Sequence, residues 1–528
     1  MRRRSQKPSQ TVAAMIAATV FAKALGLLRS ALLARTLGDL PEAAAFAAAS
    51  KIPSAFFDLF FSAALTGAFI PAYSAARTES EGSARGFSRA FMGAVLTGAS
   101  VFSLVGVIFS PLLIRLCAPN MGGETAALAA ALLRIMFPAA VFTAGAYTLT
   151  GLLQARGSFI LPAAVSLISN AFTAGYIFFS RGSFSVYALA AVYVFSWVLQ
   201  MLTLALPLIR RGEFPRPKID FRSKHLKKAL ASAPKITAGA WFSPASVLAA
   251  AFFCSFVSEK AFVIYDYAGG IYTVAAGVAI YGVGNFCFPA LAAAFAEGEQ
   301  KLFSEKLGSS LFSALAVAVP VFCAVLALAP EGVTLLYARG NFTAEAASAC
   351  ALALRTLSPS IPAYAASEVL SRAFYAAEKP KVTALAALFA LAALVLANAL
   401  SLSLGGGLFG VCASFAIAQW AHALFLLLSA RKLFAHFSSG RTLLLAPGCV
   451  LCLAAMLPTG RFLPIFSAFT PSISIFLKIT IVFTAGVVVY LLYIFVYTKV
   501  FAGKNSKTES EVKRPCKTER KQKRAKGL

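Results

Sequence analysis

The sequence predicts an all-α polytopic membrane protein with about fourteen transmembrane helices. Hydrophobic residues make up 59% of the 528 residues and charged residues 13%, whereas soluble chains average about 45–50% and about 25%. Apolar stretches long enough to cross a bilayer, about 20 residues, recur along the chain. Lys and Arg gather in alternate gaps between these stretches, which is typical of cytoplasmic loops.

The first predicted span covers 11–37. The Arg2–Arg4 cluster before it is reminiscent of a signal peptide, but the apolar run continues past Lys23 and Arg29. It is therefore too long and too charged for a cleaved segment. Five more apolar stretches complete an N-terminal lobe over residues 1–210, with predicted spans at 44–75, 87–117, 125–155, 159–180 and 184–209.

Residues 211–227 are the longest polar break ahead of the tail, and we expect a basic cytoplasmic linker there. This break divides the first twelve spans into two sets of six. The second set predicts a C-terminal lobe over 228–430, with spans at 228–257, 262–295, 303–328, 344–376, 382–403 and 406–430.

The end of the chain predicts two additional helices within 431–502, at 442–458 and 473–499. Residues 503–528 contain ten Lys or Arg against three Glu and almost no apolar residue. Such a segment cannot bury enough surface to fold. We expect a disordered basic tail held near anionic lipid.

The distribution of Lys and Arg predicts the orientation. If the N-terminus is cytoplasmic, the basic clusters all fall inside and the intervening loops stay poor in Lys and Arg around the whole chain. We therefore expect a multi-pass protein of the cell (inner) membrane with both termini in the cytoplasm.

Composition also excludes several function classes. The net charge of +28 is spread over short gaps and both termini, so it forms no module that suits nucleic acid. Cys449 and Cys452 have a CxxC spacing but no nearby partners for a metal, and the histidines are scattered. With no nucleotide loop, metal cluster or catalytic triad, we expect a transporter rather than an enzyme, without cofactors.

Ionisable residues within spans indicate where a polar cavity lies. Lys23 and Arg29 flank Gly26 in the first span and stand about 120° apart around the helix axis. Two cations beside a bare backbone patch suit a helix that lines a hydrated cavity. Structural pairing of these cations is the alternative.

The second span has a polar stripe at four-residue spacing: Ser54, Asp58, Ser62 and Thr66, with Lys51 one turn earlier. Such a stripe faces protein or water rather than lipid. Asp58 either pairs with Lys51, Lys23 or Arg29, or helps to shape a cavity and responds to a cation.

The tenth span places Glu368 and Arg372 four residues apart, which predicts a structural ion pair. Arg355, in the outer half of the same span, has no evident local partner. Both features lie in an otherwise apolar stretch.

Several motifs resemble the MurJ/MviN family of lipid II flippases, within the MOP/MATE-like superfamily. They occur in family order from the first to the tenth span. They are Leu25-Gly-Leu-Leu-Arg29, Lys51-Ile-Pro53, Ala68-Phe-Ile-Pro71, Arg339-Gly-Asn-Phe-Thr343 and Val369-Leu-Ser-Arg-Ala-Phe-Tyr375.

This resemblance implies two pseudo-symmetric six-helix lobes around a cationic cavity, with two extra C-terminal helices that form a groove for a lipid tail. It implies a flippase that moves undecaprenyl-pyrophosphate-linked peptidoglycan precursor, lipid II, from the inner to the outer leaflet by alternating access. Membrane lipids, and cell-wall synthesis proteins, are the implied partners. The expected substrate-binding residues are Lys23, Gly26, Arg29, Lys51, Asp58 and Ser62.

The sequence departs from the family pattern at Phe57 and Gly270, where the family usually has arginines. Which residues replace them stays open. An exporter of another polyprenyl-linked saccharide, a cation-coupled solute antiporter and a non-transporting membrane scaffold are the alternative functions.

Overall fold

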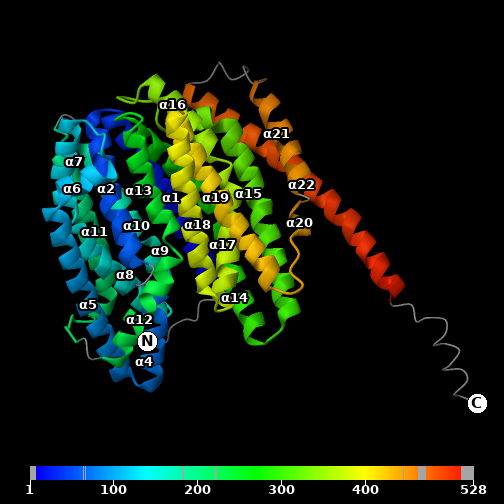
Figure 1. Ribbon diagram of the computed structural model, residues 1–528, viewed down its shortest axis with the longest axis horizontal. Helices are drawn as coiled ribbons and strands as arrows, with labels where there is room; N and C mark the ends of the chain where they lie inside the picture. The colour runs from blue at the N-terminus through cyan, green and yellow to red at the C-terminus, as the bar shows by residue number, and fades with distance from the viewer. Residues whose placement is uncertain are drawn as a thin grey trace, which may run out of the picture. The chain divides into compact units, whose positions relative to one another are not determined.

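The computed structural model describes residues 8–512, except 63–64, 66, 181–182, 221–222, 444 and 462–470. These residues form helices and loops, with no strand among them (Figure 1). The predicted fold class, an all-α polytopic membrane protein, is confirmed. The chain divides into two compact units, residues 1–439 and residues 440–528.

The helices ahead of residue 211 are called here the first half. They are α1 (Pro8–Leu37), α2 (Pro41–Phe57), the π-turn η1 (Asp58–Ser62), α4 (Phe69–Glu79), α5 (Glu81–Ile108), α6 (Ser110–Cys117), α7 (Gly123–Met136), α8 (Ala139–Ala155), α9 (Ile160–Ala164), α10 (Ser166–Phe179) and α11 (Val186–Arg210).

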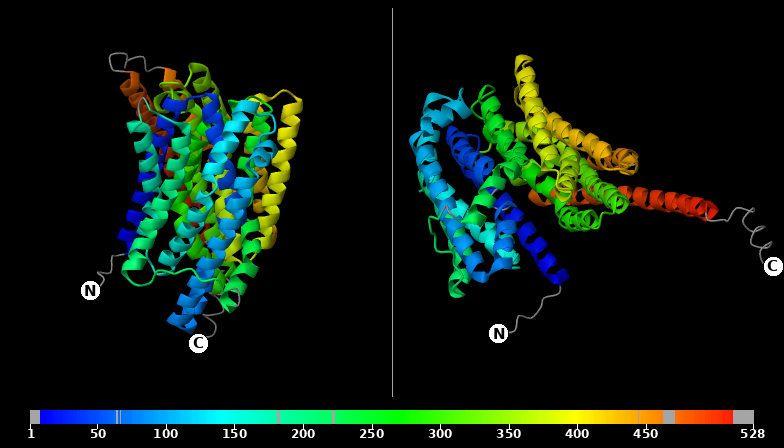
Figure 2. Two further views of the ribbon diagram at one scale, coloured as in Figure 1. Left: turned by 90° about the vertical axis from the view of Figure 1, so that its left-hand side faces the viewer. Right: turned by 60° about the horizontal axis from the view of Figure 1, so that its bottom comes forward.

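The remaining helices of the first unit are called the second half. They are α12 (Lys224–Ala238), α13 (Phe242–Ser255), α14 (Ala261–Ala296), α15 (Gln300–Leu336), α16 (Ala344–Leu357), α17 (Ser360–Ala376), α18 (Pro380–Ser403) and α19 (Gly407–Leu433). Figure 2 shows these helices running side by side with those of the first half.

Several predicted spans are pairs of helices that break where the sequence opposes an α-helix. Pro138 separates α7 from α8, which bend by 44°. Pro359 separates α16 from α17 in the same way. Proline has no backbone N–H and clashes with the preceding turn, so the helix restarts after it.

By length and composition, nine of the described helices can cross a membrane, or ten if α7 and α8 form one span. Among the other predicted spans, 262–295 coincides with the continuous helix α14, and 228–257 and 442–458 include the shorter helices α13 and α21. The span predicted at 44–75 falls on α2, η1 and α4, and each of the others falls on one helix or on a broken pair. A hydropathy test applied to single helices therefore counts too few membrane spans, because each helix of a broken pair is shorter than the thickness of a bilayer.

The segment that follows α11 lies along the first half. The Lys218 N–H donates to the carbonyl oxygen of Arg89 on α5 at 3.1 Å, and Arg89 Nε donates to the Arg216 carbonyl at 3.4 Å. Gly93 permits this approach, because a Cβ there would lie 2.3 Å from the Lys218 oxygen. The predicted linker is thus fixed to α5 rather than free.

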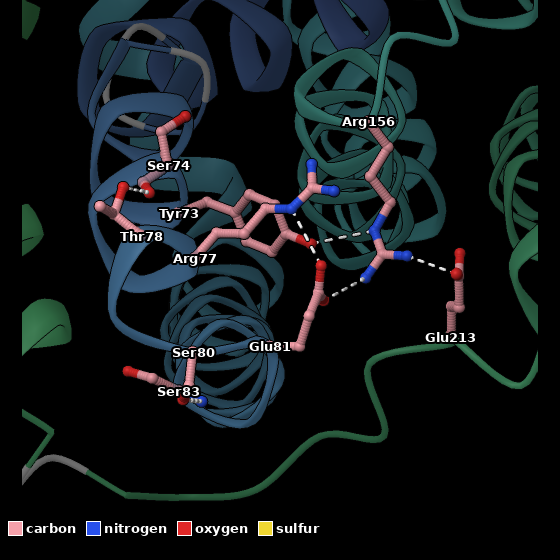
Figure 3. Close-up of polar contacts among 9 residues, drawn as sticks. All are labelled: Tyr73, Ser74, Arg77, Thr78, Ser80, Glu81, Ser83, Arg156 and Glu213. Atoms are coloured by element: carbon pink, nitrogen blue, oxygen red, sulfur yellow. Dashed lines mark hydrogen bonds and ion pairs between the residues drawn. The ribbon is translucent and has the colours of Figure 1, made fainter.

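Arg156, at the end of α8, joins this segment to two helices of the first half (Figure 3). Its Nε donates to the Tyr73 hydroxyl of α4 at 2.9 Å, and its Nη1 lies 2.5 Å from a Glu213 carboxylate oxygen. Glu81 of α5 lies 4.0 Å from Nη2 and also pairs with Arg77 at 2.9 Å. Acidic partners therefore pair with Arg77 and Arg156 at this predicted cytoplasmic end.

The second unit contains α20 (Gly440–Leu443), α21 (Leu445–Arg461) and α22 (Pro471–Val512). Glycine lets α21 and α22 pack closely, since a Cβ on Gly448 would lie 2.8 Å from the Tyr493 ring and one on Gly486 2.3 Å from Met456. The helix α22 continues to Val512, into the segment predicted to be disordered. No proline interrupts it before Pro515. Residues 513–528 lie outside the described part.

Candidate functional site

A cavity of about 1350 Å³ lies between the two halves of the first unit. The first half lines it with residues of α1, α2, α9 and α10, and the second half with residues of α13, α14, α17 and α19. The lining extends to Tyr375, next to the end of α17 that is predicted to face the cytoplasm. Sites for drug-sized ligands measure about 300–1,000 Å³, so this cavity suits a larger headgroup.

The cavity face of α1 carries three of the predicted site residues. Lys23, Gly26 and Arg29 all line the cavity, and Arg29 Nε has no hydrogen-bond partner among the described residues. Gly26 gives Asn170 of α10 room, because a Cβ on Gly26 would lie 3.4 Å from Asn170 Nδ2. That nitrogen donates to the Ala22 carbonyl at 3.1 Å. The structure therefore brings two cations and a stretch of bare helix to one wall.

Lys51 of α2 also lines the cavity, but its partner is not the predicted one. Its Nζ lies 2.7 Å from Oδ1 of Asp266 on α14, so the pair connects the first half to the second. The two side chains are 43% and 30% exposed. Asp266 also acts electrostatically on Arg29.

Asp266 is the functional candidate that the sequence interpretation missed. It is a carboxylate inside a long apolar span, about one turn before Gly269 and Gly270. Ionisable residues in such spans are costly and usually have a role. That rule, applied to the eighth span, would have found it.

Glu368 and Arg372 of α17 form the ion pair that their spacing predicts, with 3.3 Å between Arg372 Nη2 and Glu368 Oε2. Both side chains line the cavity. Arg372 Nη1 has no hydrogen-bond partner in the described part of the chain. The pair therefore forms part of the cavity wall as well as joining two turns of one helix.

Arg355 has a partner that the sequence did not reveal. Its Nε donates to the Leu326 carbonyl of α15 at 3.2 Å. Pro330, four residues after Leu326, has no N–H to offer that carbonyl. Arg355 thus supplies the hydrogen bond that the proline removes.

The polar stripe predicted along the second span does not face the cavity as a unit. Asp58 is absent from the cavity lining, and the Ser54 hydroxyl lies 3.1 Å from that of Tyr193 on α11. The π-turn that begins at Asp58 has hydrogen bonds between residues five apart, so it rotates the residues that follow it off a four-residue stripe. The side chains of Ser62 and Thr66 lie outside the described residues.

At the predicted outer end, the two halves are joined by main-chain contacts. The Asn341 N–H donates to the Arg35 carbonyl at 3.0 Å, and its Nδ2 donates to the Thr36 carbonyl at 2.7 Å. Gly38 and Gly340 have φ values of +56° and +66°. A Cβ on Gly38 would lie 2.1 Å from the Asn341 oxygen, and one on Gly340 2.2 Å from the Arg35 oxygen. We call these contacts the outer seam.

An ion pair accompanies the outer seam. Lys260 Nζ donates to Oδ2 of the buried Asp39 at 2.7 Å. Burial by itself would raise the pKa of Asp39, but the hydrogen bond and charge of Lys260 hold that pKa below its usual value. The predicted outer end is therefore closed in this structure.

Within the described residues, no group of three His, Cys, Asp or Glu is arranged to hold a metal ion. Cys452 is buried and Cys449 partly buried. The polar groups of the cavity are cations, carboxylates, hydroxyls, amides and the imidazole of His422. This set binds ligands by charge and hydrogen bonds.

Comparison with known proteins identifies the family. A sequence model of the lipid II flippase MurJ family matches residues 33–483. The chain belongs to the lipid II flippase MurJ family. A probable lipid II flippase MurJ of Bdellovibrio bacteriovorus is 26% identical over 385 residues, 72% of this chain and 73% of that protein. The lipid II flippase MurJ of Burkholderia cenocepacia is 26% identical over 424 residues, 78% and 82% of the two chains.

Solved structures agree on the fold. A lipid II flippase MurJ in an inward closed conformation superposes with a TM-score of 0.76 at 21% identity, covering 92% of this chain and 99% of that one. A multidrug resistance MATE family transporter in an inward-facing conformation gives 0.66 at 16% identity, covering 81% and 98%. The expected MATE-like architecture is thereby confirmed.

Membership of the MurJ family makes this chain a lipid II transporter, and favours that function over the alternatives drawn from the sequence. The chain differs from the family pattern within the cavity region. Phe57, in place of an arginine, is buried and stacks on Phe61 and Tyr147 at centroid distances of 5.3 and 6.0 Å. Gly270 lines the cavity. Of the two positions at which the resemblance implies arginines, Phe57 thus belongs to a buried aromatic cluster and Gly270 to the cavity wall.

Proposed function

We propose that the cavity receives the headgroup of lipid II and that Lys23, Arg29 and Lys51 bind its pyrophosphate. The observation that carries this proposal is the concentration of three cations on the first-half wall. A pyrophosphate cannot cross hydrocarbon unaided, because moving its charge out of water costs far more than any single contact returns. Charge-assisted hydrogen bonds from Lys and Arg offset that cost in a wet cavity.

The direction of transport is from the inner to the outer leaflet by alternating access. The closed outer seam and a lining that extends towards the predicted cytoplasmic end support a state ready to load from the inside. The Lys and Arg pattern supports cytoplasmic termini in an inner membrane. Cell-wall synthesis proteins as partners stay a prediction.

Asp266 has a part in this cycle. Its carboxylate forms an ion pair with the Lys51 ammonium group when no phosphate is present, and this pair links α2 to α14. An entering pyrophosphate competes for the same ammonium group and frees Asp266. Loading the cavity would therefore release one contact between the halves.

The test is complementation of a strain depleted of its own lipid II flippase, with precursor translocation as the readout. Lys23→Ala and Arg29→Ala should abolish complementation while the protein still reaches the membrane in normal amounts. Arg35→Ala is the matched control, because Arg35 is a cation on the same helix but lies outside the cavity lining. Full activity of both cavity variants would refute the proposal.

A further inference from the structure

The two walls of the cavity differ in the types of side chain that line them. The first-half wall supplies Lys23, Arg29 and Lys51, and no aromatic residue among the described lining residues. The second-half wall supplies every aromatic ring of that lining, and its one cation, Arg372, is paired with Glu368. An anion and a neutral ring-shaped group would therefore favour opposite walls.

The rings of the second-half wall form a connected cluster. Tyr272 of α14 lies edge-on to Phe415 of α19 at a centroid distance of 5.8 Å, and Phe242 of α13 stacks on Phe415 at 6.3 Å. Tyr272 and Phe415 are only partly buried, so part of each ring borders the cavity. Phe242 also contacts the imidazole of His422 at 5.3 Å.

His422 gives the second, independent observation. Its side chain lines the cavity and is 9% exposed, yet neither ring nitrogen has a hydrogen-bond partner among the described residues. Buried polar atoms without hydrogen-bond partners are costly to the folded state. One turn away, Gln419 donates to the Ser367 hydroxyl at 3.0 Å, so this wall also holds a neutral amide and a hydroxyl.

A neutral imidazole has one donor and one acceptor, and a ligand hydroxyl can form a hydrogen bond with either of them. A phosphate offers acceptors only. Sugar rings present hydroxyls at their edges and C–H groups on their faces, and the C–H faces pack on aromatic rings. The aromatic faces and the acceptor nitrogen of His422 therefore suit a saccharide better than a pyrophosphate.

We propose that Tyr272, Phe415 and His422 form a saccharide subsite on the second-half wall, opposite the pyrophosphate subsite. This inference rests on the proposed function. It places the pyrophosphate of the lipid II headgroup on the first-half wall and the sugar portion on the second-half wall. The sugar portion of the headgroup stacks on Phe415 and Tyr272, and a sugar hydroxyl pairs with His422 once its imidazole rotates towards the cavity.

The test compares two lipids on the purified full chain in nanodiscs: undecaprenyl pyrophosphate and the same lipid carrying the disaccharide-peptide. His422→Leu and Phe415→Leu should each weaken binding of the saccharide lipid about ten-fold, equivalent to about 1.4 kcal/mol, and leave binding of undecaprenyl pyrophosphate within about two-fold. His422→Gln keeps a donor and an acceptor, so it should retain most of the preference. Phe425→Leu is the matched control, because Phe425 lies on the same helix outside the cavity lining.

The outcomes separate the two proposals. Equal loss of both lipids in the His422 and Phe415 variants, or no loss of either, would overturn the saccharide subsite. Failure of the unmodified protein to bind either lipid would instead refute the proposed function, and the subsite with it. If His422→Leu does not fold, Tyr272→Leu carries the same comparison.

Discussion

At the scale of single residues, the Lys51–Asp266 ion pair is the contact that a bound anion can most readily replace, by competing for the Lys51 ammonium group. Both partners are partly exposed in a wet cavity, and ion pairs of that kind contribute only about 0.2–1 kcal/mol. A pyrophosphate brings more charge than one carboxylate and can pair with Arg29 as well. The pair is therefore weak enough for the substrate to replace.

Replacing Asp266 tests this competition. Asp266→Asn should bind undecaprenyl pyrophosphate about two- to five-fold more tightly, since Lys51 loses its resident partner. Lys51→Met should bind it more weakly. Titration of both variants in nanodiscs measures the effect, and weaker binding by Asp266→Asn would show that the carboxylate supports the ligand instead.

At the scale of elements, the second span shows where sequence periodicity succeeds and fails. Its existence, and the inward position of Lys51, followed from hydrophobicity and from the cost of a charge in lipid. The change from α to π geometry at Asp58 did not follow, because it depends on the packing around that residue. Likewise, no local pattern links Arg355 to Leu326, which lies on another helix.

The turns at Gly38 and Gly340 give an element-scale prediction. Gly38→Ala should strain a left-handed turn by about 1–2 kcal/mol and push it against the Asn341 carbonyl, so the outer seam should open. Maleimide labelling of a cysteine placed at Thr36 should then become faster from the outer side. Gly405→Ala is the control, since Gly405 also has a positive φ of +72° but no atom within 4 Å of an added Cβ. Equal labelling in both variants would contradict this role.

At the scale of the whole first unit, charge composition and hydropathy were enough to predict a polytopic helical transporter with a cationic wall. They could not predict the contacts between the halves, because Asp39–Lys260 and Lys51–Asp266 join residues more than 200 positions apart. Nor could they show that the cavity aromatics gather on one wall. Such features depend on the tertiary arrangement rather than on any local pattern.

The Asp39–Lys260 pair predicts a pH response of the closed state. The folded-state pKa of Asp39 is lowered, so its contribution is complete above the ordinary Asp pKa of about 3.9 and is lost as the pH falls through the folded value. Spin labels at the exposed positions Glu124 and Ser348 should therefore move apart below about pH 4. Asp39→Asn should show the larger separation already at neutral pH, with no further change on acidification. An unchanged distance in Asp39→Asn at neutral pH would exclude this mechanism.

The outer seam consists mainly of hydrogen bonds to main-chain carbonyls, which carry no net charge. Dissolved salt screens exposed ion pairs strongly and such bonds hardly at all. Raising the ionic strength should therefore accelerate exchange between Lys51 and Asp266 inside the cavity and leave the Asn341 contacts unchanged. In a concentrated medium, the Lys51–Asp266 pair would therefore break more readily while the Asn341 hydrogen bonds of the outer seam persist.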